Sequence, residues 1–544
     1  MKYPFNKKNI PYIVVLFFFS VASAIFLGSF YSKSYIHSDA SQYLSVAENI
    51  VQGAGIKTNI IYYQQHHDQS TIPATQTVFP PGLPALIATV HLLTGLSLSV
   101  SLYAICVIFF LAVPVQLFFL FTNTGVNKVY GILIVSTCYM FSYFILQTIN
   151  FASELLFTYI TLLSTVYIAN IESFEKRISA RYLIVIGLLA GASMTVRYAG
   201  IFYIMSLMIY FTYKYFIYRN SSSFKNLLIL MSAAAVIPAL LFIRNYYYTG
   251  SLTGGPSVTE GSTIMETLYA IRWQFSMLFG YFINGVDIGI AEISLFVVLF
   301  LIFSLCVIDI KKFPILLKSI IGLFSEVAKF SLVYIALSLS ILIYFSITKS
   351  DGYFNARYIM VLFPFFLIIF SEIVRVYMES HTKNYIRNGV VIFCIFITFL
   401  SGQYELYKYH IAERMSENST GSLIYPIDNI MINDMSLTRY LEESITETNP
   451  LLTNKAQRLW VHLRIPLVSF TPNLFTRTIW DNIKAKEMIE KYNIKYILLY
   501  KKYFNSQSKA FDNQLFYKNV INSDFPDWIN VIYNSDEILF MEII

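Results

Sequence analysis

Long apolar runs, separated by short polar loops, make up most of the first 406 residues. Most of these runs are long enough for a helix to cross the ~30 Å hydrocarbon core of a bilayer at about 1.5 Å per residue. Because lipid offers the backbone no hydrogen-bond partners, each run is expected to be an α-helix. The runs lie at 11–31, 99–121, 127–148, 151–171, 182–196, 199–218, 226–244, 288–308, 328–347, 357–378 and 387–406. This pattern predicts a mainly α, polytopic transmembrane helical bundle of about eleven spans.

Basic residues in the loops predict which side of the membrane each loop faces. Lys2, Lys7 and Lys8 precede the first run, so the N-terminus is expected in the cytoplasm. The stretch Phe79–Leu93 is apolar but short, and it begins with a run of prolines. If this stretch does not span, the strongly basic loops all fall inside; they lie at 128, 175–181, 214–225, 311–312 and 383–387. We therefore expect Phe79–Leu93 to be an interfacial or re-entrant segment on the outer side.

The character of the chain changes near Tyr407, where Asp, Glu, Asn and Lys become frequent. The amphipathic stretch Asp481–Tyr492 predicts a helix. Short runs typical of β-strands lie on both sides of it, at 451–453, 494–499, 528–532 and 538–543. We therefore divide the chain into a transmembrane domain, 1–406, with a long first outer loop at 32–98, and a small extracytoplasmic α/β domain, 407–544. This second domain is expected either to guide the acceptor or to serve as a structural cap.

Composition places the protein in the cell membrane and excludes two other classes. Hydrophobic residues make up 56% of the chain and charged residues 13%, about half the charge of a soluble domain. The net charge of +7 is spread over short loops, whereas a nucleic-acid-binding protein gathers basic residues on one face. We therefore expect no nucleic-acid partner. The cysteines Cys106, Cys138, Cys306 and Cys394 lie inside apolar runs without metal-site or disulfide spacing, which indicates inert packing residues.

The first outer loop concentrates polar residues of a kind that is scarce elsewhere in the membrane part. They are His37, Asp39, Glu48, His66, His67 and Asp68. Long loops on a compact body often carry function. Residues 39–52 predict an amphipathic helix along the bilayer surface, with Tyr43 on its apolar face. Asp39, at the start of this helix, is either a general base for an acceptor hydroxyl or a helix cap.

Charged residues at the outer ends of the predicted spans form a second candidate. The alternation of sides places Glu154, Arg197, Arg244 and Arg357 at the same interface. A single arginine there commonly anchors the chain to lipid phosphates. Three arginines together with carboxylates favour a site that balances the charge growing on a phosphate leaving group.

A divalent cation beside that phosphate is an alternative way to balance the charge. His66, His67 and Glu154 are the residue types that would hold it. Two neighbouring histidines in a loop are also frequently ordinary polar residues, so both interpretations stay open at this point.

Several short motifs follow one another in a defined order. They are His37-Ser38-Asp39-Ala40 with Tyr43, Ala47-Glu48-Asn49-Ile50 with Gly53 and Gly55, Phe79-Pro80-Pro81-Gly82-Leu83-Pro84, Ser153-Glu154-Leu155-Leu156-Phe157, Gly187 to Arg197, Arg244-Asn245-Tyr246 with Gly250, and Arg357-Tyr358 before Pro364. This order resembles the GT-C membrane glycosyltransferases, in the branch that includes the protein O-mannosyltransferases and the bacterial aminoarabinose lipid A transferases. The resemblance covers roughly residues 1–400.

The resemblance implies a glycosyltransferase with a sugar donor carried on a polyprenyl phosphate or pyrophosphate. The acceptor would be a lipid, a glycan or a protein at the outer membrane face. Asp39 and Glu154 would then be the catalytic carboxylates, and the substrate-binding residues would be Arg197, Arg244, Arg357 and Tyr43. Many members of the family carry an aspartate where this chain has Glu154, and an adjacent acidic pair in the first loop is absent here.

Three other functions fit parts of the pattern. A secondary transporter of a lipid or small solute would also have many spans, but it would place polar groups near the midplane between matched repeats, and no repeat is visible. A lipid-linked glycan ligase or polymerase would differ mainly in its acceptor. A membrane scaffold would use the terminal domain to bind a partner.

Overall fold

The computed structural model describes residues 9–30, 38–136, 152–171, 174–253, 263–268, 271, 322–348, 356–380, 435–469, 481–501, 515–536 and 538–544. The chain divides into two compact units. The first, called here the helical unit, comprises Met1–Ser34, Ala104–Leu240 and Glu260–Met415. The second, called here the sheet unit, comprises Tyr35–Tyr103, Leu241–Thr259 and Ser416–Ile544. Each unit therefore combines segments that are far apart in the sequence.

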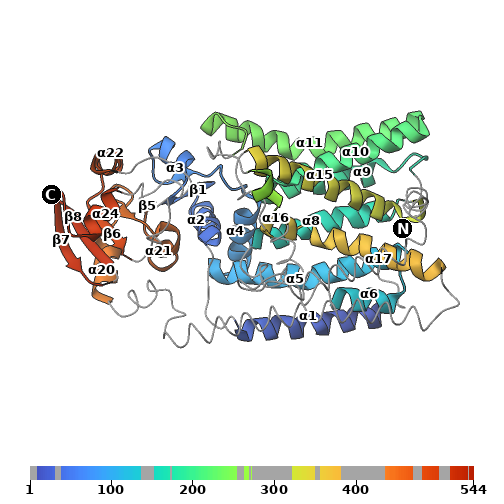
Figure 1. Cartoon of the computed structure of the whole chain (residues 1–544), viewed down its shortest axis with the longest axis horizontal. Coiled ribbons are helices and arrows are strands. Elements are labelled where there is room, and N and C mark those ends of the chain that lie inside the picture. Colours follow the sequence, from blue (N-terminus) through green and yellow to red (C-terminus); the bar gives the residue numbers. More distant parts are fainter. Residues whose placement is uncertain are drawn as a thin grey trace. The chain divides into compact units, whose positions relative to one another are not determined.

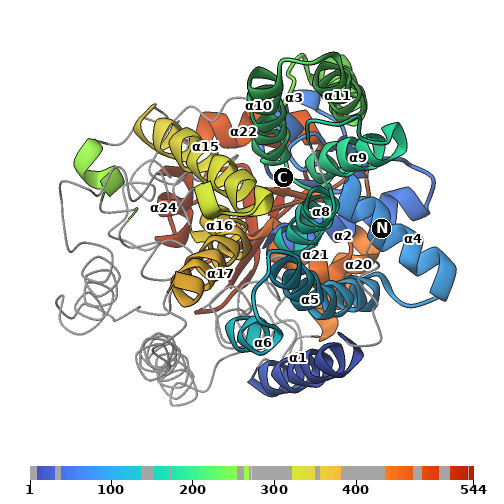
Figure 2. The ribbon, with the colours of Figure 1, turned by 90° about the vertical axis from the view of Figure 1, so that its right-hand side faces the viewer.

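The helical unit is built from long apolar helices that run side by side, seen lengthwise in Figure 1 and end-on in Figure 2. They are α1 (Ile10–Phe30), α5 (Leu98–Asn123), α6 (Lys128–Ile134), α8 (Ala152–Ala169), α9 (Ala180–Val196), α10 (Gly200–Tyr218), α11 (Ser221–Thr249), α15 (Glu326–Thr348), α16 (Ala356–Met360) and α17 (Phe363–Ser380). The first residues of α5 and the last of α11 belong to the sheet unit. Helices occur wherever a predicted span falls within the described residues.

Within the described residues, four helices are long and apolar enough to cross a membrane: α5, α10, α11 and α15. Shorter apolar helices accompany them, including α8 and α9. The predicted spans at 288–308 and 387–406, and the second half of 127–148, lie outside the described residues. The described part thus has the character of a transmembrane bundle, and the number of spans stays a prediction.

Close packing of α9 on α11 depends on two glycines of the Gly187–Arg197 motif. A Cβ built on Gly187 would lie 2.7 Å from the Cβ of Ala233 and 2.9 Å from the carbonyl oxygen of Leu230. A Cβ on Gly191 would lie 3.0 Å from the carbonyl oxygen of Ala234. The spacing of four residues puts both glycines on one face of α9, which is the way membrane helices bring their backbones together. These glycines therefore serve helix packing.

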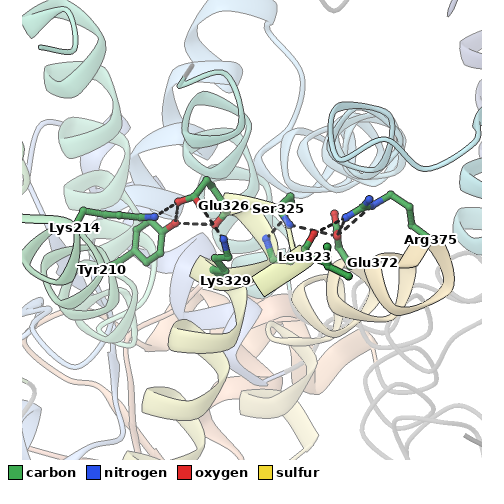
Figure 3. A network of polar contacts seen from close by, with 9 residues as sticks. Tyr210, Lys214, Leu323, Ser325, Glu326, Lys329, Glu372 and Arg375 are labelled. Carbon is green, nitrogen blue, oxygen red and sulfur yellow. Dashed lines mark hydrogen bonds and ion pairs between the residues drawn. The ribbon is translucent and has the colours of Figure 1, made fainter. Parts of the chain in front are cut away.

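Charged residues also fasten the end of the helical unit where α10 ends and α15 begins, which we call the Lys214 end (Figure 3). Lys214 of α10 forms an ion pair with Glu326, the first residue of α15, and Tyr210 donates a hydrogen bond to the same carboxylate at 2.5 Å. On α17, Arg375 Nη2 pairs with the fully buried Glu372 at 2.8 Å and also donates to the carbonyl oxygen of Leu323 at 2.8 Å. These contacts hold three helices together at one end.

The sheet unit contains a six-stranded sheet in the order β2-β5-β4-β6-β8-β7 (Figure 1). The strands are β2 (Ile60–Ile61), β4 (Leu451–Thr453), β5 (Leu467–Ser469), β6 (Tyr496–Tyr500), β7 (Ile529–Asn534) and β8 (Ile538–Ile543). The four strands predicted from the sequence are confirmed as β4, β6, β7 and β8. The sequence patterns did not predict β5 or β2, which comes from the first outer loop and pairs with β5 in parallel, Ile60 opposite Leu467.

Helices and short strands complete the sheet unit. They are α2 (Ser38–Val51), α3 (Gln64–Gln69), α4 (Gly82–Thr94), α20 (Met435–Ser444), α21 (Ala456–Leu463), α22 (Asn482–Tyr492) and α24 (Leu515–Ile521), with a ribbon of β1 (Lys57–Thr58) and β3 (Ala74–Thr75). The predicted helix at 481–492 is confirmed as α22, and Asp481 caps it by accepting a hydrogen bond from the Lys484 N–H at 3.0 Å.

Helix α2 does not lie along a surface, and this prediction was wrong. Its polar residues Gln42 and Ser45 are completely buried, as are its apolar residues Leu44 and Ala47. Ser45 Oγ accepts a hydrogen bond from the backbone N–H of Asn59 at 2.9 Å. The polar face of α2 thus binds the rest of the first loop, which is why an amphipathic pattern arises in a helix that is covered on both faces.

Candidate functional site

A buried ion pair at the other end of the helical unit, which we call the Arg197 end, joins two of the predicted site residues. Glu154, in the first turn of α8, is completely buried. Its carboxylate accepts a hydrogen bond from Ser153 Oγ at 2.7 Å and forms an ion pair with Arg197 Nη1. The same Nη1 donates to Ser153 Oγ at 3.1 Å. Two side chains from the first turn of α8, Ser153 and Glu154, therefore hold this guanidinium in one orientation.

The backbone explains why Arg197 lies where it does. Helix α9 ends at Val196, and Arg197 is extended, with φ −147° and ψ 135°. The next helix begins at Gly200, where a Cβ would lie 2.6 Å from the backbone nitrogen of Met194. This tight turn fixes the point at which Arg197 leaves α9. Its guanidinium carbon lies 5.5 Å from the ring centroid of Tyr358, within the range of a cation–π contact.

Arg357 precedes Tyr358 in α16. Its side chain lies outside the described residues. The position of Tyr358 beside Arg197 nevertheless places the backbone of α16 at the Arg197 end. The predicted role of Arg357 stays a prediction.

Asp39 lies in the first turn of α2 within the sheet unit and is 8% exposed. Tyr63 lies close to it. Burial raises the pKa of Tyr63 well above its usual value, the negative charge of Asp39 raises this pKa further, and the nearby side chain of Gln457 on α21 opposes the rise. Tyr43 is buried and packs edge-on against Phe79, with ring centroids 5.2 Å apart. The carboxylate therefore lies in a largely aromatic setting that α21 helps to close.

Arg244 is placed differently from Arg197. Its Nη2 donates to the backbone carbonyl oxygens of Gln76 at 3.0 Å and Ile56 at 3.3 Å, and its Nη1 donates to Asn245 Oδ1 at 3.1 Å. The guanidinium carbon also lies 5.6 Å from the ring centroid of Tyr248. These contacts fasten the end of α11 to the loop segments beside the β1–β3 ribbon.

His66 and His67 are both buried, and their surroundings favour the neutral form. The Nδ1 atom of His66 accepts a hydrogen bond from the Tyr62 N–H at 3.5 Å, and its Nε2 lies 3.1 Å from Gln76 Oε1. Burial lowers the pKa of His66 to about 4. Burial, together with His66 and Lys491, lowers the pKa of His67 to about 3. Both nitrogens of His66 therefore have partners within the protein.

These two histidines do not fit a cation site of the kind considered from the sequence. Both nitrogens of His66 have partners within the protein, and the carboxylate of Glu154 is paired with Arg197. Within the described residues, no group of three or more His, Cys, Asp or Glu side chains is arranged to hold a metal ion.

Sequence reasoning missed Ser153 as a partner of Arg197 and Gln457 as a neighbour of Tyr63. Ser153 directly precedes Glu154, so a helix-start motif could have indicated it. Gln457 lies almost 400 positions after Tyr63. No local pattern could have connected the two residues.

Comparison with known proteins identifies the fold. No protein-family model and no curated protein matches the sequence. Among solved structures, ArnT from Cupriavidus metallidurans bound to undecaprenyl phosphate matches with a TM-score of 0.52 and 9% identity over 98% of this chain and 96% of that one. ArnT is a membrane glycosyltransferase of the GT-C type. This chain has the GT-C fold.

Two further GT-C structures cover nearly the whole of this chain. The archaeal oligosaccharyltransferase AglB from Archaeoglobus fulgidus, in complex with an inhibitory peptide and a dolichol-phosphate, has a TM-score of 0.55 and 12% identity over 97% of this chain and 79% of its own. The arabinofuranosyltransferase AftD from Mycobacteria has a TM-score of 0.52 and 12% identity over 97% of this chain and 40% of its own. The Archaeoglobus protein has also been solved with Zn and sulfate. At these identities the GT-C fold is shared, and the chemistry has to be argued from the residues.

Proposed function

We propose that this chain is a membrane glycosyltransferase that moves a sugar from a polyprenyl-phosphate-linked donor to an acceptor at the extracytoplasmic face of the membrane. The observation that carries the proposal is the arginine at the Arg197 end of a GT-C bundle, held by a fully buried carboxylate. A phosphate leaving group gains negative charge in the transition state, and a preoriented guanidinium stabilises that charge. The GT-C structures with undecaprenyl phosphate and with dolichol-phosphate support a donor of this class.

In the proposal, Arg197 binds the donor phosphate and Glu154 orients Arg197. Both described contacts of Arg197 to side-chain oxygens are made by its Nη1 atom. A guanidinium has five N–H donors in all. Arg357, which precedes the Tyr358 ring that faces Arg197, would approach the same phosphate. Arg244 would support the loop that carries the base.

Asp39 is the proposed general base. Its position beside the half-buried Tyr63 puts a carboxylate in an aromatic environment, and Tyr43 belongs to the same cluster. The proton of an acceptor hydroxyl would pass to this carboxylate while the bond between the sugar and the donor phosphate breaks. A positioned base contributes about 10²–10⁴-fold to a rate.

The activity is tested by incubating the purified full-length protein with radiolabelled polyprenyl-phosphate sugars and a membrane extract as acceptor source. Consumption of the donor and release of polyprenyl phosphate are expected. A protein that transports the labelled lipid or solute without consuming it would contradict the proposal. Asp39→Asn should reduce donor consumption about 100-fold or more, while Asp68→Asn, at an exposed carboxylate of the same loop, should leave it unchanged.

The role of Arg197 has a matched control within the chain. Arg375 is also paired with a completely buried glutamate, but it lies at the opposite end of the helical unit. Arg197→Lys keeps the charge and loses the planar fork, so the KM for the donor should rise by about ten- to a hundredfold, the value of a charge-assisted phosphate contact. Arg375→Lys should leave this KM unchanged. Equal effects of the two changes would mean that both pairs only support the fold.

A further inference from the structure

Helix α21 brings three long polar or aromatic side chains to one side of the sheet unit. Gln457, Trp460 and Arg464 follow one another at intervals of three and four residues, so they share a face of the helix and its C-terminal extension. The helix packs on α2. Gln457 lies near Tyr63, which neighbours Asp39 at the start of α2, and Arg464 lies near Glu48 toward its end. Helix α21 therefore runs beside α2 in the same direction.

Arg464 and Trp460 present two hydrogen-bond donors without partners. The guanidinium carbon of Arg464 lies 4.2 Å from the centroid of the Trp460 ring, and its Nη2 donates to Ser99 Oγ at 3.3 Å. Its Nη1 is buried and makes no hydrogen bond, and the same is true of the indole Nε1 of Trp460. Trp460 as a whole is completely buried, whereas Arg464 is partly exposed. Both donor atoms are thus buried, while another part of the Arg464 residue is exposed.

The charge of Arg464 is also poorly balanced. Within the described part of the chain, no salt bridge includes Arg464. Glu48 is the nearby carboxylate, and burial raises its pKa while Arg464 lowers it. Burial lowers the pKa of Arg464, and the attraction of Glu48 only partly opposes this change. A donor that is buried without a partner destabilises the fold, and a charged donor does so more strongly.

An oxyanion would satisfy both donors at once. A carboxylate or phosphate oxygen accepts charge-assisted hydrogen bonds from a guanidinium, and an indole N–H beside it adds a second donor. We propose that Trp460 and Arg464 bind an anionic group, a carboxylate or a phosphate, of the acceptor whose hydroxyl Asp39 deprotonates.

This inference rests on the proposed function for its link to an acceptor, and binding of the anion is tested without any transfer reaction. Radiolabelled inorganic phosphate is dialysed to equilibrium against the full-length protein in a neutral detergent, with acetate as a competitor. Saturable binding is expected. Arg464→Gln should weaken it at least tenfold, and Trp460→Phe, which keeps an aromatic ring and removes the N–H, should weaken it several-fold.

Arg439→Gln is the matched control, because Arg439 is exposed on α20 of the same unit. It should bind phosphate as the unmodified chain does. Arg464 also contacts Ser99, so thermal unfolding of each variant is measured in parallel, and Arg464→Lys, which restores the charge, should recover part of the binding. Non-saturable binding, or equal binding by Arg464→Gln and the unmodified chain, would overturn the proposal.

The source of the anionic group is distinguished by repeating the dialysis in nanodiscs. If phosphatidic acid in the bilayer displaces the labelled phosphate, the site takes a group carried on a lipid. If neutral and phosphatidic acid nanodiscs bind phosphate equally, the site takes a soluble acceptor. Donor consumption is measured separately. Donor consumption without anion binding refutes only the acceptor site. Anion binding without donor consumption refutes only the proposed transferase.

Discussion

Lowering the pH from 7 to 5 should destabilise the sheet unit, because the fold holds two buried histidines neutral. Burial lowers the pKa of His66 from 6.5 to about 4 and that of His67 to about 3. Unfolded histidines titrate near 6.5. Below that pH the unfolded chain binds protons that the folded chain does not, so stability falls as the pH falls. The loss begins near pH 6.5 and continues down to the folded pKa of each histidine.

The size of the loss follows from the distance between the pH and the unfolded pKa. One pKa unit corresponds to about 1.4 kcal/mol, so at pH 5 each histidine has lost about 2 kcal/mol and the pair about 4 kcal/mol. A domain is stable by only about 5–15 kcal/mol in total. For a unit of this size the change corresponds to a fall in melting temperature of about 8–16 °C.

Thermal unfolding of the full-length protein in detergent, followed by tryptophan fluorescence at pH 7, 6 and 5, measures this loss. Trp460 and Trp528 report on the sheet unit. The double change His66→Gln with His67→Gln removes both titrating groups and should flatten the dependence on pH. His91→Gln, at a partly exposed histidine of α4, should leave it as it is. A melting temperature that does not change between pH 7 and 5 would refute the assignment of both histidines as buried and neutral.

Three further changes test the helical unit. Glu154→Gln should leave Arg197 without its counter-charge and lower stability by about 3–5 kcal/mol, measured by thermal unfolding. Gly187→Ala should cost about 1–3 kcal/mol, since a Cβ there meets a neighbour at 2.7 Å, whereas Gly322→Ala, which has open space around it, should be neutral in the same assay. Lys214→Met, at the opposite end from Arg197, should lower stability without changing the KM for the donor.

The helical part of the fold was largely predictable because the relevant pattern is local. A run of apolar residues in lipid has to become a helix, and α10, α11 and α15 cover the predicted spans. The sheet was harder to predict. Strand β2 has only two residues, and its partner β5 lies some 400 positions away. Nothing in a stretch as short as Ile60–Ile61 distinguishes it from a loop, so only the tertiary structure reveals this pairing.

The candidate site was likewise predictable in part. The alternation of spans was enough to predict that Glu154 and Arg197 lie at one end of the bundle, and the ion pair agrees with that placement. The error on α2 arose because Gln42 and Ser45 match a solvent-facing pattern, while in the structure they bind the loop that follows. A polar face predicts only that hydrogen-bond partners exist. It does not say whether those partners are water or protein.

Arg197 and Arg244 look equivalent in the sequence, but their hydrogen-bond partners in the structure indicate different roles. Arg197 is bound by side chains, Glu154 and Ser153, and side chains of this kind orient a guanidinium without changing the path of the backbone. Arg244 is bound by carbonyl oxygens of the first loop, so moving it toward a phosphate would release the loop. The number of arginines at an interface therefore does not by itself give the number that bind substrate. The partners of each guanidinium decide which arginine supports the fold and which can respond to a ligand.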